Sequence, residues 1–465
     1  MRNSVTRLGL TLATLGYVAL AQAGNPVITE RFSADPAALV HDGVVYLYAG
    51  HDQAAEDGDF FVLKEWSIYS SEDLKDWTLE GSLPRTEFEW ARGDTAWASQ
   101  AIERDNKFYW YVTVLNDDPD PERSGFALGV AVSDHPVHGW QDAIGGPLVT
   151  SDMTEAPEFM DAEETWDNID PTVFIDEEGQ AHLYWGNTHL YYAPLKDNMI
   201  ELEGDIQQIE IANMPGTFTE APWLHEYEGL YYLTFAMNYP EELAYATSDN
   251  PEGPWEYAGL IMDTLEDSGT SHQAVLEYED QWYLIYHTAA LPTGGNYRRA
   301  VSMEHLNYNE DGSIQKITPT ASGIHYQSKH LQSVANGQAY IAYDEQPEIT
   351  VGPFDEAHHF SFEWHLKSLQ DIDNTLSFQP ETRAGYYLAE QGGTLQISRH
   401  DGTDEFIQKT TFERVEGLSD ESAESYRLLH SPEHYLMLDG ETLVLTSPQS
   451  ESERQAATFH VHSSD

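Results

Sequence analysis

A hairpin pattern that recurs five times is the feature that most constrains the fold of this 465-residue chain. In each copy, a two-residue turn begins with Asp or Glu and continues with Gly, Asn or Asp, and a short strand rich in aromatic and β-branched residues follows. This combination is typical of a tight β-hairpin with a half-buried second strand. The copies occupy residues 42–48, 105–111, 178–184, 228–234 and 279–285.

The copies lie about 50 to 75 residues apart, a spacing that favours the blades of a propeller. We therefore predict an all-β protein with a five-bladed β-propeller over residues 24–325. One residue of chemical interest precedes each turn, and all five face the central axis if they share one place on the innermost strand. In chain order these residues are Asp35, Trp97, Asp170, Glu220 and His272.

A different repeat follows residue 325. Residues 326–336 are polar and are predicted to be a linker, and residues 337–465 hold three β repeats of about 43 residues. The two clearer copies share a Tyr-Leu pair and a Thr-Phe pair, at Tyr387-Leu388 and Thr411-Phe412 and again at Tyr435-Leu436 and Thr458-Phe459. Three such repeats predict a C-terminal β-trefoil domain.

Residues 1–23 are predicted to be a secretory signal peptide. A basic start at Arg2 and Arg7 precedes an apolar run from Leu8 to Leu20, and Ala21-Gln22-Ala23 matches a small-x-small cleavage site. The run is too short for a membrane anchor, which needs about 20 apolar residues. We therefore expect an exported protein, periplasmic or extracellular, with no membrane span in the mature chain.

The charge balance excludes several classes of partner. The chain has 22 basic and 80 acidic residues, a net charge of −58, so contact with a nucleic acid or an anionic membrane is not expected. Aromatic residues make up 12% of the chain, which indicates a folded protein with an acidic surface rather than a disordered acidic one. With no cysteine, disulfides and thiol catalysis are excluded.

Three of the five residues that precede the turns are carboxylic acids, namely Asp35, Asp170 and Glu220. Hydrolysis of a glycosidic bond needs one protonated and one ionised carboxyl group beside the bond. A third carboxylate nearby would raise the pKa of the acid by like-charge repulsion. Each residue alone fits an ordinary turn, but their shared place in the repeat favours an active site. A non-catalytic carbohydrate-binding surface protein, the alternative from another class, would need none of the three.

These motifs resemble glycoside hydrolase family 43 over roughly residues 25–320. They are Ala34-Asp35-Pro36, Ala96–Gln100, Ile169–Thr172, Leu183–Asn187, Thr219–Trp223 and Tyr297–Val301. The resemblance implies an enzyme that inverts the anomeric configuration, with Asp35 as general base and Glu220 as general acid. Asp170 would then tune and orient the acid. Many members carry Gly where this chain has Ala221, which is tolerable unless the backbone needs a positive φ there.

The resemblance also implies a His and an Arg in the pocket, and His272 and Arg299 match those places. Arg299 would pair with a sugar hydroxyl or a carboxylate, whereas Arg298 should face the other way on its strand. No cofactor is expected to be required. A calcium ion near His272 at the propeller axis is a further hypothesis, although calcium prefers oxygen ligands.

Trp97, Trp185 and His51 are additional candidates to line the sugar-binding pocket, with packing between sheets as the alternative for each. His287 is interpreted as a structural histidine.

The C-terminal repeats resemble carbohydrate-binding module family 42, which binds arabinose, and this implies His400-Asp401 and Asp404 as candidate sugar ligands. The predicted function is therefore release of terminal α-L-arabinofuranosyl residues from plant cell-wall polysaccharides or oligosaccharides. β-Xylosidase, endo-arabinanase and galactanase remain alternatives within the family. Retaining fructan-processing enzymes, which share the five-bladed fold, are a further alternative. The sequence does not give the oligomeric state.

Overall fold

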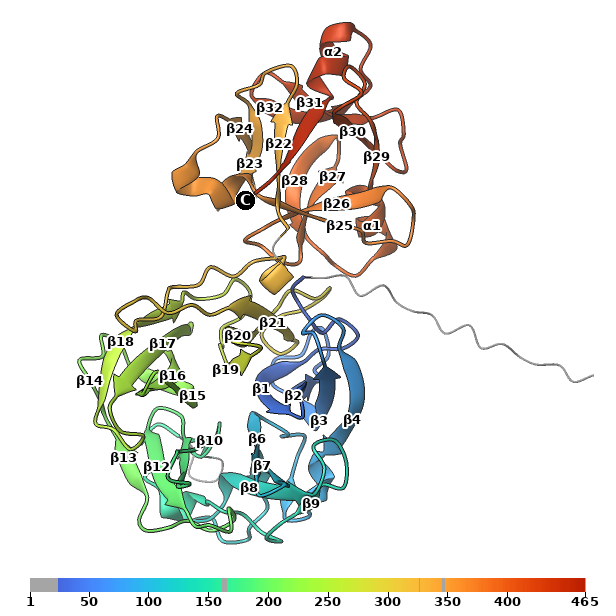
Figure 1. The fold of residues 1–465 in the computed structure, drawn as a ribbon. Coiled ribbons are helices and arrows are strands. Elements are labelled where there is room, and N and C mark those ends of the chain that lie inside the picture. The colour runs from blue at the N-terminus through green and yellow to red at the C-terminus, as the bar shows by residue number, and fades with distance from the viewer. Residues whose placement is uncertain (1–23, 161–164, 326, 345–347, 465) are drawn as a thin grey trace, which may run out of the picture.

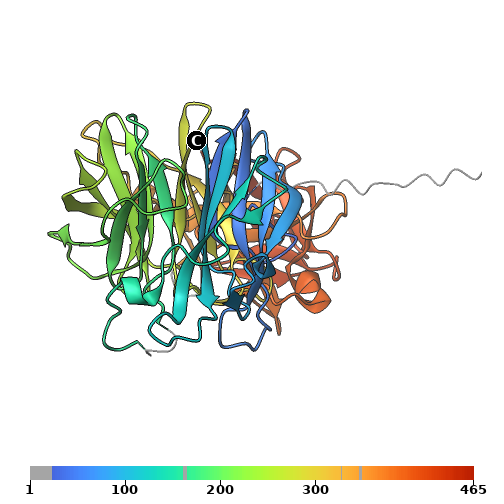
Figure 2. The same cartoon turned by 90° about the horizontal axis from the view of Figure 1, so that it is seen from below.

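The computed structural model describes residues 24–160, 165–325, 327–344 and 348–464. The predicted signal peptide lies outside the described residues. Five β-sheets form a ring, and a second β-domain lies beside it (Figure 1). Figure 2 shows the ring from its edge, with the strands running between its two faces. The predicted all-β fold class is therefore confirmed. Within these residues, no helix is long and apolar enough to cross a membrane.

Each sheet of the ring is one antiparallel blade, apart from a short parallel edge strand in the fourth. The first blade holds β1 (Ala34–His41), β2 (Val44–Asp52), β3 (Leu63–Ser71) and β4 (Thr78–Pro84). The second holds β5 (Ala91–Arg92), β6 (Ser99–Arg104), β7 (Lys107–Asn116), β8 (Gly125–Ser133) and β9 (Gln141–Asp142). The third holds β10 (Thr172–Ile175), β11 (Ala181–Trp185), β12 (Leu190–Leu195) and β13 (Gln207–Ile209).

The fourth blade holds β14 (Ile211–Ala212), β15 (Phe218–Tyr227), β16 (Leu230–Met237), β17 (Glu242–Ser248) and β18 (Trp255–Met262). The fifth holds β19 (Gln273–Tyr278), β20 (Gln281–Thr288) and β21 (Ala300–His305). Short 3-10 helices occupy Arg85–Glu87, Ser151–Met153, Gly323–His325 and Glu356–Phe362.

The five hairpins predicted from the sequence are the inner hairpins of the five blades. They join β1 to β2, β6 to β7, β10 to β11, β15 to β16 and β19 to β20. In four of them both turn residues have positive φ, as at Asp42 (51°) and Gly43 (78°), which the tightest two-residue turn requires. In the third blade the Glu178-Gly179 pair has positive φ only at Gly179 (87°).

The N-terminal segment closes the ring against the last blade. The backbone N–H of Val27 donates to the carbonyl of Val301 (2.8 Å), and that of Ser33 donates to the carbonyl of Arg299 (2.8 Å). The first blade begins one residue after Ser33, so this closure brings the start of β1 and the start of β21 together. Residues 264 positions apart in sequence, Asp35 and Arg299, thereby become neighbours.

The C-terminal domain contains twelve strands within the described residues, four for each repeat of a trefoil. Their bounds are β22 (Lys329–Ser333), β23 (Tyr340–Tyr343), β24 (Ile349–Gly352), β25 (Trp364–Lys367), β26 (Thr375–Pro380), β27 (Tyr386–Gln391), β28 (Thr394–Arg399), β29 (Phe412–Glu416), β30 (Glu424–Leu428), β31 (Tyr435–Asp439), β32 (Thr442–Thr446) and β33 (Phe459–Ser463). Two short helices, α1 (Asp404–Thr410) and α2 (Glu451–Ala456), precede β29 and β33.

Within the segment predicted to be a linker, residues 329–333 form a strand of this domain instead. β22 pairs with β33 from Lys329 opposite Ser463 to Ser333 opposite Phe459. The strand buries Leu331 and Ser333, and its other three residues are polar and half-buried. Leu331 is therefore the single apolar residue of the strand. A strand with so few apolar residues is indistinguishable from a polar linker by composition.

Candidate active site

The residues that precede the five turns meet in one pocket at the axis of the ring. Because each lies at or just before the start of the inner strand of its blade, the propeller symmetry carries all five to the same end of the central channel. The pocket has a volume of about 530 Å³. Its walls include Asp35, Trp97, Asp170, Glu220, His272 and Arg299.

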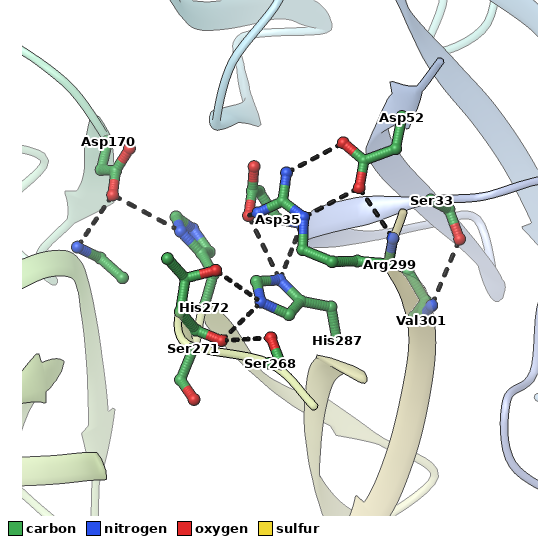
Figure 3. Close-up of polar contacts among 12 residues, drawn as sticks. Ser33, Asp35, Asp52, Asp170, Ser268, Ser271, His272, His287, Arg299 and Val301 are labelled. Atoms are coloured by element: carbon green, nitrogen blue, oxygen red, sulfur yellow. Dashed lines mark hydrogen bonds and ion pairs between the residues drawn. The ribbon is translucent and has the colours of Figure 1, made fainter. Parts of the chain in front are cut away.

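Asp35 is held as an ionised carboxylate. Nη1 of Arg299 lies 2.8 Å from its Oδ1, and Asp52 at the end of β2 fixes the same guanidinium through Nε (2.9 Å) and Nη2 (3.0 Å), as Figure 3 shows. Burial raises the pKa of Asp35, but the positive charge of Arg299, together with the smaller contributions of His287 and His272, outweighs burial and holds that pKa well below its ordinary value. Asp35 is therefore a proton acceptor at neutral pH.

His287 supports Asp35 from below. Its Nε2 lies 3.0 Å from the carbonyl oxygen of Thr270, which can only accept, so the ring proton resides on Nε2. Its Nδ1 then accepts the backbone N–H of Asp35 at 3.3 Å (Figure 3). Complete burial lowers the pKa of His287 and keeps the ring neutral. The interpretation of His287 as structural agrees with these contacts, and the group that it supports is the candidate base.

Glu220 is held in the opposite protonation state. Burial, and then the negative charge of Asp170, raise its pKa to about 8. Nδ2 of Asn187 donates to its Oε2 at 2.6 Å, which fixes the carboxyl group in one orientation. A carboxyl group that keeps its proton at neutral pH is a candidate general acid.

Asp170 orients the backbone next to Glu220. Its Oδ2 accepts the N–H of Ala221 at 3.0 Å, and its own N–H donates to Oγ1 of Thr113 at 3.0 Å. Ala221 has φ 57°, so the backbone does need a positive φ at this position. The condition under which Ala is less suitable than Gly is thus met, and the Ala is accommodated at a cost on the order of 1 kcal/mol relative to Gly.

Glu241, a fourth carboxylic acid of the pocket, has no signal in the sequence. It lies in the β16–β17 turn, is buried, and accepts the backbone N–H of Ser271 through Oε2 at 2.6 Å. Burial, and then Glu220, raise the pKa of Glu241 well above its ordinary value. Since the turn between β16 and β17 carries no repeat of its own, only the folded chain brings Glu241 to the site.

His272 and Trp97 occupy the pocket wall as expected from the sequence. Nδ1 of His272 lies 3.6 Å from Oδ2 of Asp170. Burial lowers the pKa of His272, but Asp170 and the other nearby carboxylates outweigh it and raise that pKa above its ordinary value. Trp97 stacks on Phe126 with ring centroids 4.0 Å apart, and its outer neighbour Phe60 remains 58% exposed at the rim.

Two predicted pocket residues lie elsewhere. Trp185 is completely buried in the packing between blades, where its Nε1 donates to Oδ1 of Asn168 at 2.8 Å. His51 lies at the end of β2 with its Nδ1 3.0 Å from Oε1 of Glu65, outside the pocket lining. Both predictions of sugar contact are therefore corrected, because neither side chain belongs to the pocket lining.

The hypothesis of a calcium ion can be compared with the donors near His272. Within the part of the chain that the structure describes, no group of three or more His, Asp and Glu side chains is arranged to hold a metal ion. His272 offers nitrogen, whereas calcium prefers six to eight oxygen ligands. The described residues therefore do not form a calcium cage, and the ion stays a prediction.

The predicted sugar ligands of the trefoil make contacts within their own repeat. Nδ1 of His400 accepts the N–H of Gly402 at 2.9 Å, and Oδ1 of Asp401 accepts the N–H of Thr403 at 2.9 Å. Asp404 lies in the first turn of α1. Their role in sugar binding stays a prediction.

One ionised and one protonated carboxyl group on the wall of a single pocket are the pair that glycosidic hydrolysis requires. The fold and the site together define a glycoside hydrolase built on a five-bladed propeller. Residues 23–314 match the family model described as Glycosyl hydrolases family 43, which covers more than half of the chain. The chain therefore belongs to glycoside hydrolase family 43. Residues 327–461 match the alpha-L-arabinofuranosidase B (ABFB) domain.

Curated relatives and solved structures agree with this family. A xylosidase/arabinosidase of Bacteroides ovatus is 29% identical over 63% of this chain and 96% of its own length. An arabinoxylan arabinofuranohydrolase of Bacillus subtilis is 30% identical over 64% of this chain and 65% of its own. The structure of a β-xylosidase/α-arabinofuranosidase from a compost metagenome, described as a calcium-free form, is 26% identical, with a TM-score of 0.56 over 64% of this chain and 98% of its own.

The two pKa shifts predict the pH dependence of the enzyme. We expect kcat/KM to fall as the pH rises through about 8, because Glu220 loses its proton there. The acid limb should lie well below the ordinary range of a carboxyl group, because Asp35 stays ionised. A pH–rate profile over the full range of stability measures both limbs.

The Asn187→Ala variant tests whether Glu220 sets the alkaline limb of the pH profile. The hydrogen bond from Asn187 favours the ionised form of Glu220, so its removal should move this limb to higher pH. Asn198→Ala, an exposed Asn on the same blade, is the control and should leave the profile unchanged. An alkaline limb that stays in place in Asn187→Ala would mean that another group sets it.

Proposed function

We propose that the protein is an exported, inverting α-L-arabinofuranosidase that removes terminal arabinofuranosyl residues from plant cell-wall polysaccharides or oligosaccharides. The observation that carries the proposal is a glycosidase pocket in the same chain as an ABFB domain. Relatives support it, since the similar Bacillus subtilis enzyme is an arabinoxylan arabinofuranohydrolase. A structure of an α-L-arabinofuranosidase from Clostridium thermocellum is 31% identical, with a TM-score of 0.50 over 63% of this chain and 95% of its own.

In the proposed mechanism, Asp35 and Glu220 act on opposite sides of the anomeric carbon. Asp35 accepts a proton from a water molecule while the water oxygen bonds to the anomeric carbon. Glu220 gives its proton to the glycosidic oxygen as the bond between that oxygen and the anomeric carbon breaks. Asp170 keeps Glu220 oriented through the N–H of Ala221. The products are the free sugar with inverted configuration and the shortened chain, after which Asp35 releases its proton to solvent and Glu220 takes one up.

The shape of the pocket supports removal of single sugars with a larger group left outside. The carboxylates lie at the buried end, while aromatic side chains such as Phe60 and Tyr239 are 58% and 72% exposed at the mouth. Exposed aromatic rings stack on sugar rings, so the mouth is suited to the remainder of the substrate.

A comparison of two aryl glycosides tests the choice of sugar. We expect p-nitrophenyl α-L-arabinofuranoside to be hydrolysed at least about tenfold faster than p-nitrophenyl β-D-xyloside, a difference of about 1.4 kcal/mol in transition-state binding. β-Xylosidase is the second candidate, because a similar structure is both a β-xylosidase and an α-arabinofuranosidase. Faster hydrolysis of the xyloside would favour that candidate. No hydrolysis of either would indicate an endo-acting enzyme or a different sugar.

Export is proposed from the predicted signal peptide at residues 1–23. N-terminal sequencing of the protein from the periplasm or the medium should begin at Gly24. A cell-associated protein that begins at Met1 would contradict it.

A further inference from the structure

Two loops that border the fifth blade hold several of the groups that support the catalytic carboxylates. Residues 263–272 join β18 to β19 and end at His272, and residues 289–299 join β20 to β21 and end at Arg299. The loops are tied together where the N–H of Gly269 donates to Oδ1 of Asn296 at 2.8 Å. A displacement of either loop would therefore shift the other loop as well.

Arg399 of the trefoil domain reaches both loops at once. From the end of β28, its Nη2 lies 2.6 Å from the carbonyl oxygen of Ala289 and 2.9 Å from that of Gly294. Its Nη1 lies 2.9 Å from Oδ2 of Asp267 in the other loop. The planar guanidinium is suited to this task, because it presents several donors in fixed directions.

The contacts around Arg399 show a closely packed interface between the domains. Arg383 forms a bidentate ion pair with Glu266, through Nε (2.9 Å) and Nη2 (2.5 Å), and stacks over the ring of Tyr386. The hydroxyl of Tyr386 donates to Asp267. At Gly385, which has φ 87°, a side chain would meet the carbonyl oxygen of Ala290 at 2.5 Å, so only Gly allows this approach.

Both loops continue from this interface into the catalytic pocket. In the first loop the carbonyl of Thr270 accepts from His287, which accepts the N–H of Asp35, and the N–H of Ser271 donates to Glu241. The second loop delivers Arg299 to Asp35. Each loop is thus in contact with the trefoil at one end and with the surroundings of Asp35 at the other.

We propose that Arg399 is a positioning residue of the glycosidase site, through which the trefoil domain supports catalysis in addition to any binding of sugar. Arg399 acts through the two loops, by holding Arg299 and Thr270 in register with Asp35. The proposal goes beyond the proposed function and is independent of the sugar that is cleaved. It requires only the glycosidase activity of the family.

The experiment compares Arg399→Ala with wild type in the full chain, on whichever aryl glycoside the wild type hydrolyses. Such a substrate is too small to bind both the pocket and the trefoil, so a change cannot come from lost sugar binding. We expect kcat to fall between about 10-fold and 100-fold, the range produced by small misplacements of catalytic groups. We also expect the acid limb of the pH profile to move to higher pH, because Arg299 no longer holds Asp35 as firmly.

Arg427→Ala is the matched control. Arg427 also belongs to the trefoil, pairs with Glu413 at 2.8 Å, and has a side chain that is 31% exposed, against 27% for Arg399. It should keep the kinetics of the wild type. Arg399→Lys should recover little activity, because an ammonium group cannot span the three acceptors.

Asp267→Asn serves if Arg399→Ala does not fold. It preserves the size of the side chain but removes the ion pair with Arg399, and we expect a smaller loss of kcat with the same direction of pH shift.

A folded Arg399→Ala or Asp267→Asn with the kcat and acid limb of the wild type would overturn the proposal. So would an equal loss in Arg427→Ala. If the wild type hydrolyses neither aryl glycoside, the proposed sugar is wrong. The same variants are then compared on the substrate that the wild type does hydrolyse.

Discussion

Replacement of Glu220 by Gln is expected to lower kcat on an arabinose-containing oligosaccharide by about 10³-fold, within the range attributed to general acid catalysis. Gln has the same shape, and the hydrogen bond from Asn187 can still reach its carbonyl oxygen, so the pocket should keep its form. What is lost is the proton that burial and Asp170 hold on Glu220 up to about pH 8. The alkaline limb of the pH profile should disappear with it.

The leaving group distinguishes loss of the acid from loss of structure. A 2,4-dinitrophenyl glycoside departs without protonation, so Glu220→Gln should lower its hydrolysis far less than that of an oligosaccharide. Glu228→Gln, an exposed acid in the turn at the end of the same strand, is the control and should match wild type on both substrates. Equal losses of Glu220→Gln on the two substrates would remove Glu220 from the role of acid.

The repeat of the sequence predicts the location of the site because a propeller converts equivalent positions in its blades into neighbours. Asp35, Asp170 and Glu220 each lie seven or eight residues before a recognisable turn, so their meeting could be inferred before any contact was known. Glu241 and Asp52 could not be found in this way. Glu241 lies at the end of a turn and Asp52 at the end of a strand, where the sequence has no repeated motif. Only long-range contacts, such as that of Asp52 with Arg299, show that these residues belong to the site.

Aromatic residues mark blades without showing which way they face. All five residues of β11 are buried, because its two faces pack against neighbouring blades. The sequence around Trp185 therefore could not show whether this side chain lines the pocket or packs between blades. A different difficulty applies to β22, whose single apolar residue, Leu331, gives no periodic pattern. Alternation identifies a buried face only when the other face meets water.

The backbone conformations of the site also could not be predicted from the sequence. Asp35 (φ 49°), Asp170 (φ 58°) and Ala221 (φ 57°) all occupy the left-handed region, which costs on the order of 1 kcal/mol or more for a residue other than Gly. Asp tolerates this region better than most residues do, which suits a carboxylate that must point into the channel directly before a Pro. The hydrogen bonds to Thr113, Asp170 and His287 hold these conformations in place.

Replacement of Asp35 by Asn is expected to lower kcat by about 10³-fold, because the amide cannot accept a proton from water. Asn tolerates the same backbone conformation and can still face Arg299, so the fold should survive. In contrast to Glu220→Gln, the loss should be equally large on oligosaccharides and on substrates that need no acid. Asp42→Asn, an exposed turn residue at the end of the same strand, is the control and should keep full activity.

The configuration of the first product decides whether Asp35 acts on water or on carbon. If it is the base, hydrolysis of the proposed α-L-arabinofuranoside substrate releases β-L-arabinofuranose first, and proton NMR detects this anomer before mutarotation mixes the two. Release of the α anomer first would show two successive displacements, with Asp35 as the nucleophile. The ion pair with Arg299 is compatible with either role, since it keeps the carboxylate ionised in both. Stereochemistry is therefore the measurement that separates them, and because the chain belongs to an inverting family we expect the β anomer.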